Sequence, residues 1–564
     1  MYSVSKGRAE EVLSPQPKHQ ASIHQSLAHG VVAVAAIAAL TVGILHGTFA
    51  AADTDPYGYL SEAEVLARGS LRIDQRSLQD VPWPNAEATF SPFGWRPATV
   101  HGFIVPIYAP GLPLVMAAFQ RLFGRPGAFY AVPILGALAV WAVGRLGTVV
   151  HGSFVGASSA VLLATSPTFL RHLVQPVSDV PTMAWWTLSL ALASAGGNAA
   201  AFGAGSAASM AILTRPNLVP LSVIAGVLVL LPRSDDAKRG RNGVVRLLLL
   251  VVGVVPGCVA IGVVNWLSNG SPLLSGYGTL DYLYSFANVV PNLDRYPRWL
   301  WEQETPFIYL AILALLAVRW RGAHTGRPSS GHMLVLLIFA LTTLLLYLPF
   351  SVFGRTEWDY LRFILPGIPA LIVLSMAAMV DIGTRVLPRK LLVVSVLTPV
   401  IVILGLYHVR LAARTGTFGI AISEKRYVDV GRYIALATPP EAAFVAGLHS
   451  GTIRYYADRL TLRYDQIEPD WLDRTLAYMG SHGHPTYIVL DEGEETIFRN
   501  RFGSRSTYGQ LDWPASVERF EPIHVRIYNP DDRARYLAGE AIITADIGFV
   551  GQPRLHQQGL DKSP

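Results

Sequence analysis

Residues 29–50 read HGVVAVAAIAALTVGILHGTFA, and residues 51–63 continue with AADTDPYGYLSEA. The first part is apolar over about 20 residues, the length that a helix needs to cross a bilayer. The second part places Asp53 and Asp55 directly behind that run. Acidic groups at the lip of a membrane are costly to place and usually functional. We therefore expect a first membrane helix followed by a loop that carries the chemistry.

Composition sets the class of protein. Of the 564 residues, 51% are hydrophobic and only 15% are charged, with a mean hydropathy of +0.37. A soluble domain of this size is less apolar, so the composition predicts a protein with many membrane spans. The formal charge of +6 is expected when cytoplasmic loops retain Lys and Arg, and we predict no nucleic-acid partner. The single cysteine, Cys258, lies in an apolar run and excludes an intrachain disulfide.

Further apolar runs predict a mainly α, polytopic fold with about eleven transmembrane helices. Their ranges are 128–149, 153–170, 180–196, 199–214, 216–232, 246–267, 305–319, 332–351, 361–380 and 391–411. The pair 199–214 and 216–232 is kept as two short helices because Pro216 interrupts helical hydrogen bonding between them.

Basic residues predict the orientation of these helices. They gather in three loops that fall on the same side as the N-terminal tail, which the positive-inside rule makes cytoplasmic. These residues are Arg233, Lys238, Arg239, Arg241 and Arg246; Arg319, Arg321 and Arg327; and Arg385, Arg389 and Lys390. The opposite, outer side then receives residues 53–127, 268–304 and 352–360 and everything after residue 411.

Two segments could change this topology. Residues 103–123 are apolar enough to span, but prolines and a glycine precede their helical part, so we expect an interfacial helix that lies on the membrane. Residues 50–52, Ala-Ala-Ala, resemble a signal-peptidase site. The apolar run before them has spanning length, which favours an uncleaved anchor.

After residue 411 the composition becomes that of a soluble domain. Residues 444–447 and 487–491 are typical of short strands followed by helix-compatible stretches. We predict a disordered cytoplasmic tail over residues 1–27, a membrane domain over 28–411 with its first outer loop at 53–127, a small extracytoplasmic α/β domain over 412–545, and a disordered tail over 546–564.

Four motifs resemble those of GT-C membrane glycosyltransferases. The acidic loop after the first helix, followed by Tyr59 and Ala63, resembles their opening loop and its Tyr-x-x-x-Ala helix. Residues 108–113 (YAPGLP) resemble the proline-proline-leucine motif, with Ala where the first proline usually stands. Residues 178–181 (SDVP) resemble the second acidic loop, and residues 361–369 (LRFILPGIP) resemble the Arg-Tyr-Leu-Leu-Pro-x-x-Pro helix start.

The resemblance covers most of residues 29–411, and it is strongest to the protein O-mannosyltransferase and aminoarabinose lipid A transferase type, including bacterial members of the dolichyl-phosphate-mannose-protein mannosyltransferase-like superfamily. It implies an inverting transferase that uses a polyprenyl-phosphate-linked hexose or pentose. Such a reaction needs a carboxylate to deprotonate the acceptor hydroxyl and cations to stabilise the departing phosphate. We assign the base to Asp55, with Asp53 as the second candidate.

A structural role is the alternative for each acid. Asp-Thr-Asp-Pro also suits an exposed loop that caps a helix from Tyr57. Ser178-Asp179 suits an N-cap for the next helix, so Asp179 is either a capping residue or a contact for acceptor or metal.

Cationic and aromatic candidates complete the predicted site. Arg215 and Arg362, with Arg355 near by, are candidates for binding the donor phosphate, since a guanidinium group binds phosphate through two hydrogen bonds. For Arg215 the alternative is an interfacial side chain that reaches the lipid headgroups. We expect Tyr59 and His101 to contact the acceptor or the sugar.

The sequence thus predicts a multi-pass enzyme of the cytoplasmic membrane that glycosylates a lipid, a glycan or a protein of the cell envelope on the outer face. A divalent metal is left open, because no ligand set emerges from the spacing of the residues. The other function classes are a flippase or transporter for a lipid-linked sugar, which would place charges near the bilayer midplane, and a non-catalytic assembly protein. The predicted spans carry almost no acidic residues in their middle, and the candidate acids cluster instead on the predicted outer face, which favours chemistry there.

Overall fold

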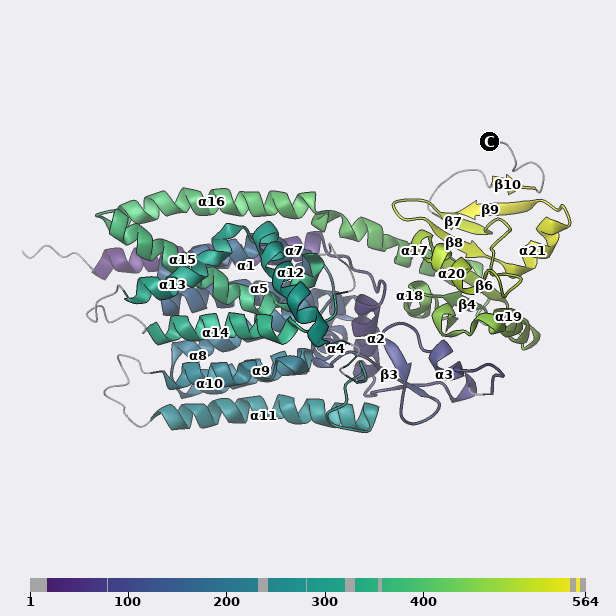
Figure 1. Ribbon diagram of the computed structural model, residues 1–564, viewed down its shortest axis with the longest axis horizontal. Coiled ribbons are helices and arrows are strands. Elements are labelled where there is room, and N and C mark those ends of the chain that lie inside the picture. Colours follow the sequence, from purple (N-terminus) through teal and green to yellow (C-terminus); the bar gives the residue numbers. More distant parts are fainter. Residues whose placement is uncertain are drawn as a thin grey trace, which may run out of the picture.

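The structure is a computed structural model that describes residues 18–78, 80–231, 242–279, 281, 283–319, 330–352, 358–547 and 554–557. A bundle of helices forms one end of the molecule and an α/β domain forms the other (Figure 1). The long helix α16 (Lys390–Arg414) and α17 (Ile420–Ala437) connect the two. Elements of the first outer loop lie between the bundle and the α/β domain.

Every apolar run predicted to span falls on one or two helices of the bundle. These helices are α1 (Lys18–Leu45), α5 (Ala131–Val150), α6 (Ser153–Thr165), α7 (Pro167–Leu173), α8 (Asp179–Ala195), α9 (Asn198–Thr214), α10 (Leu221–Leu230), α11 (Asn242–Asn269), α13 (Leu310–Arg319), α14 (Ser330–Tyr347), α15 (Ile368–Val386) and α16. Within the described residues, 5 helices are long and apolar enough to cross a membrane, or 6 if α6 and α7, bent by 58°, form one span. The chain is therefore a mostly helical, multi-helix membrane protein, and the predicted eleven spans stay a prediction.

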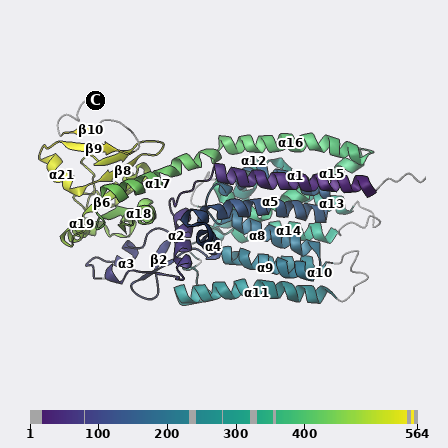
Figure 2. The same ribbon diagram turned by 180° about the vertical axis from the view of Figure 1, so that it is seen from behind.

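The two ends of the bundle differ. The first residues of α1, α11, α14 and α16 lie at the end away from the α/β domain, and so do the last residues of α10, α13 and α15 (Figures 1 and 2). The predicted basic loops join these helix ends. The loop of residues 53–127 lies at the opposite end (Figure 1), and which end faces the cytoplasm stays a prediction.

The first outer loop contains short helices and a small sheet. Its elements are α2 (Asp55–Ala67), β1 (Ile73–Asp74), α3 (Ala86–Thr89), β2 (Trp95–Pro97), β3 (Phe103–Pro106) and α4 (Gly111–Phe123). The prediction of an interfacial helix is wrong for the start of residues 103–123, because Phe103–Pro106 is the central strand of the sheet β1-β3-β2. Pro110 marks where helix geometry begins, and α4, with 13 residues, is short for a span.

The C-terminal α/β domain has a mixed sheet of seven strands in the order β10-β9-β7-β8-β6-β4-β5. Its elements after α17 are β4 (Ala443–Ala446), α18 (His449–Ala457), β5 (Leu460–Arg463), α19 (Leu472–Ser481), β6 (Thr486–Asp491), α20 (Glu492–Phe502), β7 (Val517–Arg519), β8 (Val525–Tyr528), α21 (Pro530–Leu537), β9 (Ile542–Asp546) and β10 (Arg554–His556). Strands β4 and β6 match the two predicted strands within a residue, and β4 pairs in parallel with both β5 and β6.

Both predicted tails are partly ordered. Residues 18–27 belong to helix α1, because the apolar helix continues toward the N-terminus beyond the predicted boundary. Strand β10 lies in the predicted C-terminal tail, pairs antiparallel with β9, and is tied by Arg554, whose guanidinium group lies 3.1 Å from the Asp546 carboxylate. These two segments therefore contain secondary structure, and the bounds of the predicted tails stay a prediction. Residues 1–17 lie outside the described part.

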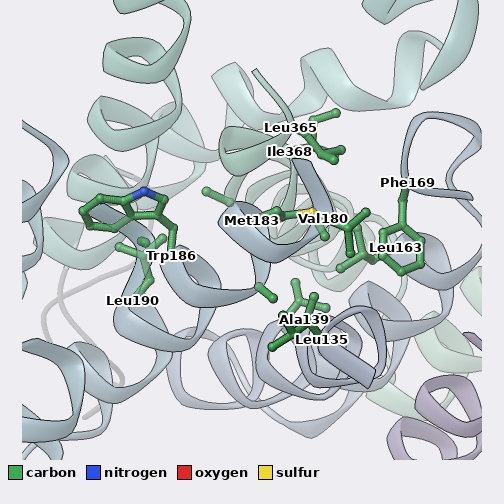
Figure 3. Packing of buried hydrophobic residues seen from close by; sticks show 14 of the residues in the cluster. Leu135, Ala139, Leu163, Phe169, Val180, Met183, Trp186, Leu190, Leu365 and Ile368 are labelled. Atoms are coloured by element: carbon green, nitrogen blue, oxygen red, sulfur yellow. The ribbon is translucent and has the colours of Figure 1, made fainter. Parts of the chain in front are cut away.

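Helix α8 is the centre of the bundle core. Val180, Met183, Trp186 and Leu190 follow one another along it at helical spacing and are fully buried, and Figure 3 shows them among side chains from α5, α6, η9 (Leu365–Gly367) and α15. Burial of large apolar side chains on this scale fixes a helix firmly in place. The first residue of this helix is Asp179, so the packing fixes the position of an acidic side chain.

Candidate active site

A cavity of about 860 Å³ opens where the bundle meets the first outer loop. Its described lining includes the starts of α2 and α8, the residues between β3 and α4, the end of α9 with the residues that follow it, and the second half of α11. Residues 272–278 and 283–284, the end of α14 and η8 (Trp358–Phe363) complete it. Four charged side chains line it, namely Asp55, Asp179, Arg215 and Arg362. Sequence analysis predicted all four as site residues.

Asp55 is the first residue of α2, and its carboxylate faces the cavity. The Tyr108 hydroxyl donates a hydrogen bond of 2.6 Å to one carboxylate oxygen, and Arg362 donates one of 3.0 Å to the other. Thr54 at the N-cap makes no side-chain capping bond, while Pro56 suits the first turn. The carboxylate of Asp55 is therefore held by side chains of the cavity rather than used to cap a helix.

Asp179 and Arg215 form the second acid–base pair of the cavity. Arg215 donates a short hydrogen bond to the Asp179 carboxylate. Arg215 is the residue at which α9 stops, because Pro216 follows it, and its backbone is extended. The Ser178 side chain makes no capping hydrogen bond to α8. The Asp179 carboxylate is bonded to Arg215, so the hydrogen bonds do not support a capping role for these two residues.

The two arginines converge. The Cζ atom of Arg362 lies 5.0 Å from the centre of the Phe363 ring, and that of Arg215 lies 5.3 Å from the same ring. A nitrogen of Arg215 also lies 3.4 Å from the Arg362 carbonyl oxygen. Both guanidinium groups line the cavity, and each is paired with one carboxylate, Arg362 with Asp55 and Arg215 with Asp179. The pair is thus suited to bind a phosphate in addition to the two carboxylates.

Tyrosines line the cavity beside the charges. The Tyr59 hydroxyl donates to Ser178 Oγ at 2.8 Å, and its ring centre lies 4.5 Å from that of Tyr108. Tyr277 adds an edge-on ring 6.1 Å from Tyr108. Burial, followed by the neighbouring Asp55 charge, raises the pKa of Tyr108 well above its usual value. Tyr108 therefore keeps its proton at neutral pH and stays a hydrogen-bond donor to Asp55.

Three predicted residues are placed elsewhere or are not described. Asp53 has a φ of 45°, its carboxylate accepts a 2.9 Å hydrogen bond from the Thr54 hydroxyl, and burial raises its pKa. His101 is 90% exposed, with a ring nitrogen 3.2 Å from Glu87. Neither is among the described residues that line the cavity. Arg355 lies outside the described residues.

Sequence reasoning missed the role of Tyr108 and the ion pair beside the cavity. Tyr108 opens the quoted YAPGLP motif, so its place in that motif was the available signal. Arg171 and Asp359 form a bidentate pair with both N–O distances 2.9 Å, and nothing in their sequence context joins residues 188 positions apart. Within the described part of the chain, no group of three or more His, Cys, Asp or Glu side chains could hold a metal ion.

The fold formed by the helical bundle and the α/β domain is similar to that of a solved GT-C membrane glycosyltransferase. The crystal structure of ArnT from Cupriavidus metallidurans bound to undecaprenyl phosphate matches 84% of this chain and 95% of that chain, with a TM-score of 0.56 and 15% sequence identity. The expected resemblance is thus confirmed at the level of the fold.

The oligosaccharyltransferase of Archaeoglobus fulgidus in the apo form matches 85% of this chain and 71% of that chain, with a TM-score of 0.49 and 14% identity. The archaeal oligosaccharyltransferase AglB from Archaeoglobus fulgidus in complex with an inhibitory peptide and a dolichol-phosphate matches 88% and 72%, with the same TM-score of 0.49. No protein-family model matches the chain, and neither does any curated protein.

Proposed function

We propose that the protein is an integral-membrane glycosyltransferase that moves a sugar from a polyprenyl-phosphate-linked donor to an acceptor of the cell envelope. The observation that carries this proposal is the Asp55 carboxylate, held by Tyr108 and Arg362 at the wall of a cavity that also contains Arg215. The fold supports it, because the similar ArnT structure is bound to undecaprenyl phosphate.

The chemistry divides between Asp55 and the arginines. Asp55 accepts the proton of the acceptor hydroxyl while the hydroxyl oxygen attacks the anomeric carbon of the sugar. The bond from that carbon to the phosphate oxygen breaks, and its electron pair leaves with the polyprenyl phosphate. Arg362 and Arg215 stabilise the charge on that oxygen through charge-assisted hydrogen bonds. Attack opposite the leaving group inverts the anomeric centre.

Asp179 has a different task in this proposal. Its carboxylate is only 2% exposed and pairs with Arg215, so it holds that guanidinium group in the direction of the cavity. Tyr59, which lines the cavity and is hydrogen-bonded to Ser178, is placed to contact the sugar. Asp53, His101 and Arg355 are given no part in the chemistry here.

The proposed topology follows the basic loops. Residues 28–411 form the membrane domain with about eleven spans, the N-terminus is cytoplasmic, and the cavity opens at the outer face. Helix α17 and the α/β domain with its seven-stranded sheet, which extends beyond the predicted boundary at residue 545 to β10, are extracytoplasmic. The acceptor is a lipid, a glycan or a protein, and the α/β domain lies at the end of the molecule from which such an acceptor would approach.

A transfer assay tests the proposal. Membranes that contain the protein are given undecaprenyl phosphate carrying radiolabelled glucose, mannose, arabinose or 4-amino-arabinose, and label in the envelope fraction is measured. We expect transfer with wild type and its loss with Asp55→Asn at matched abundance. The proposal fails if wild type and Asp55→Asn give equal transfer of label. If removal of the protein also keeps the sugar lipid in the inner leaflet, the protein is a flippase.

A further inference from the structure

Helix α18 of the C-terminal domain is bonded to the first outer loop along its length. The Ser450 hydroxyl accepts a 3.2 Å hydrogen bond from the Phe93 amide, and Arg454 donates one of 2.5 Å to the Phe90 carbonyl oxygen. The Tyr456 hydroxyl accepts a 2.8 Å hydrogen bond from the Ala51 amide. These bonds join residues 357 to 405 positions apart in the chain.

The packing between α18 and α2 is close. A Cβ atom on Gly451 would lie 2.2 Å from the Tyr57 ring, so only glycine permits this approach. Tyr57 is buried and lies two residues after Asp55 in the same helix. The C-terminal domain therefore contacts the helix that carries the proposed base, as well as the residues that lead into it.

Those leading residues have an unusual backbone. Ala50, Ala51 and Ala52 are all fully buried, and they lie between Phe49 and Asp53, whose φ values are 40° and 45°. Residues other than glycine rarely adopt this left-handed region. Tyr427 of α17 packs against Ala50 and Ala52. Contacts from the C-terminal domain thus cover a strained segment that ends at Asp53, two residues before Asp55.

The contacts lie at the carboxyl end of strand β4, and α/β domains commonly bind ligands at the carboxyl ends of their strands. Strand β4 lies between β5 and β6, and in open parallel sheets ligands bind beyond the carboxyl ends of strands at such a point. Helix α18 begins just after β4. Beside it the Arg463 guanidinium lies 4.2 Å from the Phe93 ring centre. The outer loop of this same chain occupies the place.

We propose that Tyr456 is a positioning residue for the transfer reaction. Its hydroxyl fixes the Ala51 amide, the left-handed turn at Asp53 follows, and α2 then presents the Asp55 carboxylate to the cavity in the direction of Tyr108 and Arg362. The inference rests on the proposed role of Asp55. It assigns the C-terminal domain a task in the geometry of the base, separate from any recognition of the acceptor.

The test uses the purified full-length protein with the undecaprenyl-phosphate sugar that gives transfer in the assay above. Tyr456→Phe is expected to lower kcat by about tenfold, since a small displacement of a reacting group is enough for that loss. The KM for the donor and the Kd for undecaprenyl phosphate should stay unchanged. Tyr487→Phe makes the same chemical change on β6, where the tyrosine ring stacks on Phe444, and should leave kcat as in wild type.

A double substitution separates positioning from general loss of structure. If Tyr456 acts through Asp55, Tyr456→Phe lowers the residual rate of Asp55→Asn no further, because interacting residues are not additive. Ser450→Ala removes a neighbouring contact of α18 and should lower kcat in the same way, by a smaller factor. An unchanged kcat in Tyr456→Phe, or the same tenfold fall in the Asp55→Asn background, overturns the inference alone. A fully active Asp55→Asn variant overturns the proposed function instead.

Discussion

The cavity contains two pairs of the same residue types that differ in their exposure. The side chains of Asp55 and Arg362 are each 31% exposed and meet at 3.0 Å. Those of Asp179 and Arg215 are 2% and 11% exposed. The first pair joins the outer loop to η8, whereas the second joins the ends of two helices that are packed in the bundle core. The more exposed pair can exchange its partners for a ligand, whereas in the buried pair Asp179 keeps Arg215 in a fixed position beside the cavity.

The difference follows from the energetics of buried charges. Separating the partly exposed Asp55–Arg362 pair costs little free energy, because water or a bound phosphate replaces the lost partner. Opening a buried pair leaves an uncompensated charge in a medium of low polarity. We therefore expect changes in the Asp55–Arg362 pair to alter the reaction with little loss of stability, and changes in the Asp179–Arg215 pair to lower stability as well as phosphate binding by Arg215.

Removal of the proposed base has the largest expected effect. Asp55→Asn keeps the shape of the side chain and a hydrogen-bond partner for Tyr108, but cannot accept the acceptor proton. Its transfer rate should fall by about a hundredfold to ten-thousandfold, with abundance and thermal stability close to wild type. A variant with normal rates would remove Asp55 from the chemistry and leave the exposed pair without a function.

The buried pair should respond in the opposite way. Asp179→Asn leaves Arg215 buried without its counter-charge, which should destabilise the bundle by about 3–5 kcal/mol. The measurement is the amount of protein in the membrane and its apparent unfolding temperature in detergent. An Asp179→Asn protein as stable as wild type would contradict the expected cost of the unpaired Arg215 charge.

An exchange of arginine for lysine compares the exposed pair with a pair outside the cavity. Arg362→Lys keeps the charge but loses the two-pronged geometry that suits phosphate, so the Kd for undecaprenyl phosphate should rise by about tenfold. Arg171→Lys is the matched control, since Arg171 is paired with Asp359 and is not among the described residues of the cavity wall. Equal losses in both variants would contradict a phosphate role for Arg362.

Asp53 gives the smallest expected effect on transfer. Asp53→Asn should change the rate by less than about threefold, because it removes no interaction with the reacting atoms and Asn tolerates the left-handed backbone. Asp55→Asn is the comparison, because it makes the same chemical change two residues further on. If Asp53→Asn lost as much transfer as Asp55→Asn, Asp53 would be a candidate for the base.

The same Asp53→Asn variant has a pH signature in stability. Burial raises the pKa of Asp53, so the folded protein holds this proton more tightly than the unfolded chain does. Stability from this group is complete below the unfolded pKa near 3.8 and is lost as the pH rises through the higher folded value. The unfolding temperature of the Asn variant, relative to wild type, should therefore increase with pH.

The sequence was a good guide to the charged residues and a poor guide to backbone details. Asp55 and Arg362 are 307 positions apart. Both were predicted as site residues because charged side chains beside membrane-spanning runs are costly and usually functional. The choice between Asp53 and Asp55 depends on a left-handed φ, which spacing does not reveal. The hydroxyl of Tyr108 and the strand β3 were missed for a related reason, since both depend on tertiary contacts that override local pattern.

The hydrogen bond from the Ala51 amide to Tyr456 also has a consequence for biosynthesis. These residues are 405 positions apart, so at the usual pace of translation Ala51 waits about 20 to 80 s for its partner to be made. During that time the loop with Asp55 has already been made but lacks helix α18, which contacts it. A chain that stops before Tyr456 contains all four charged residues of the cavity but lacks the hydrogen bond to the Ala51 amide, so the contacts around this loop are completed only late in synthesis.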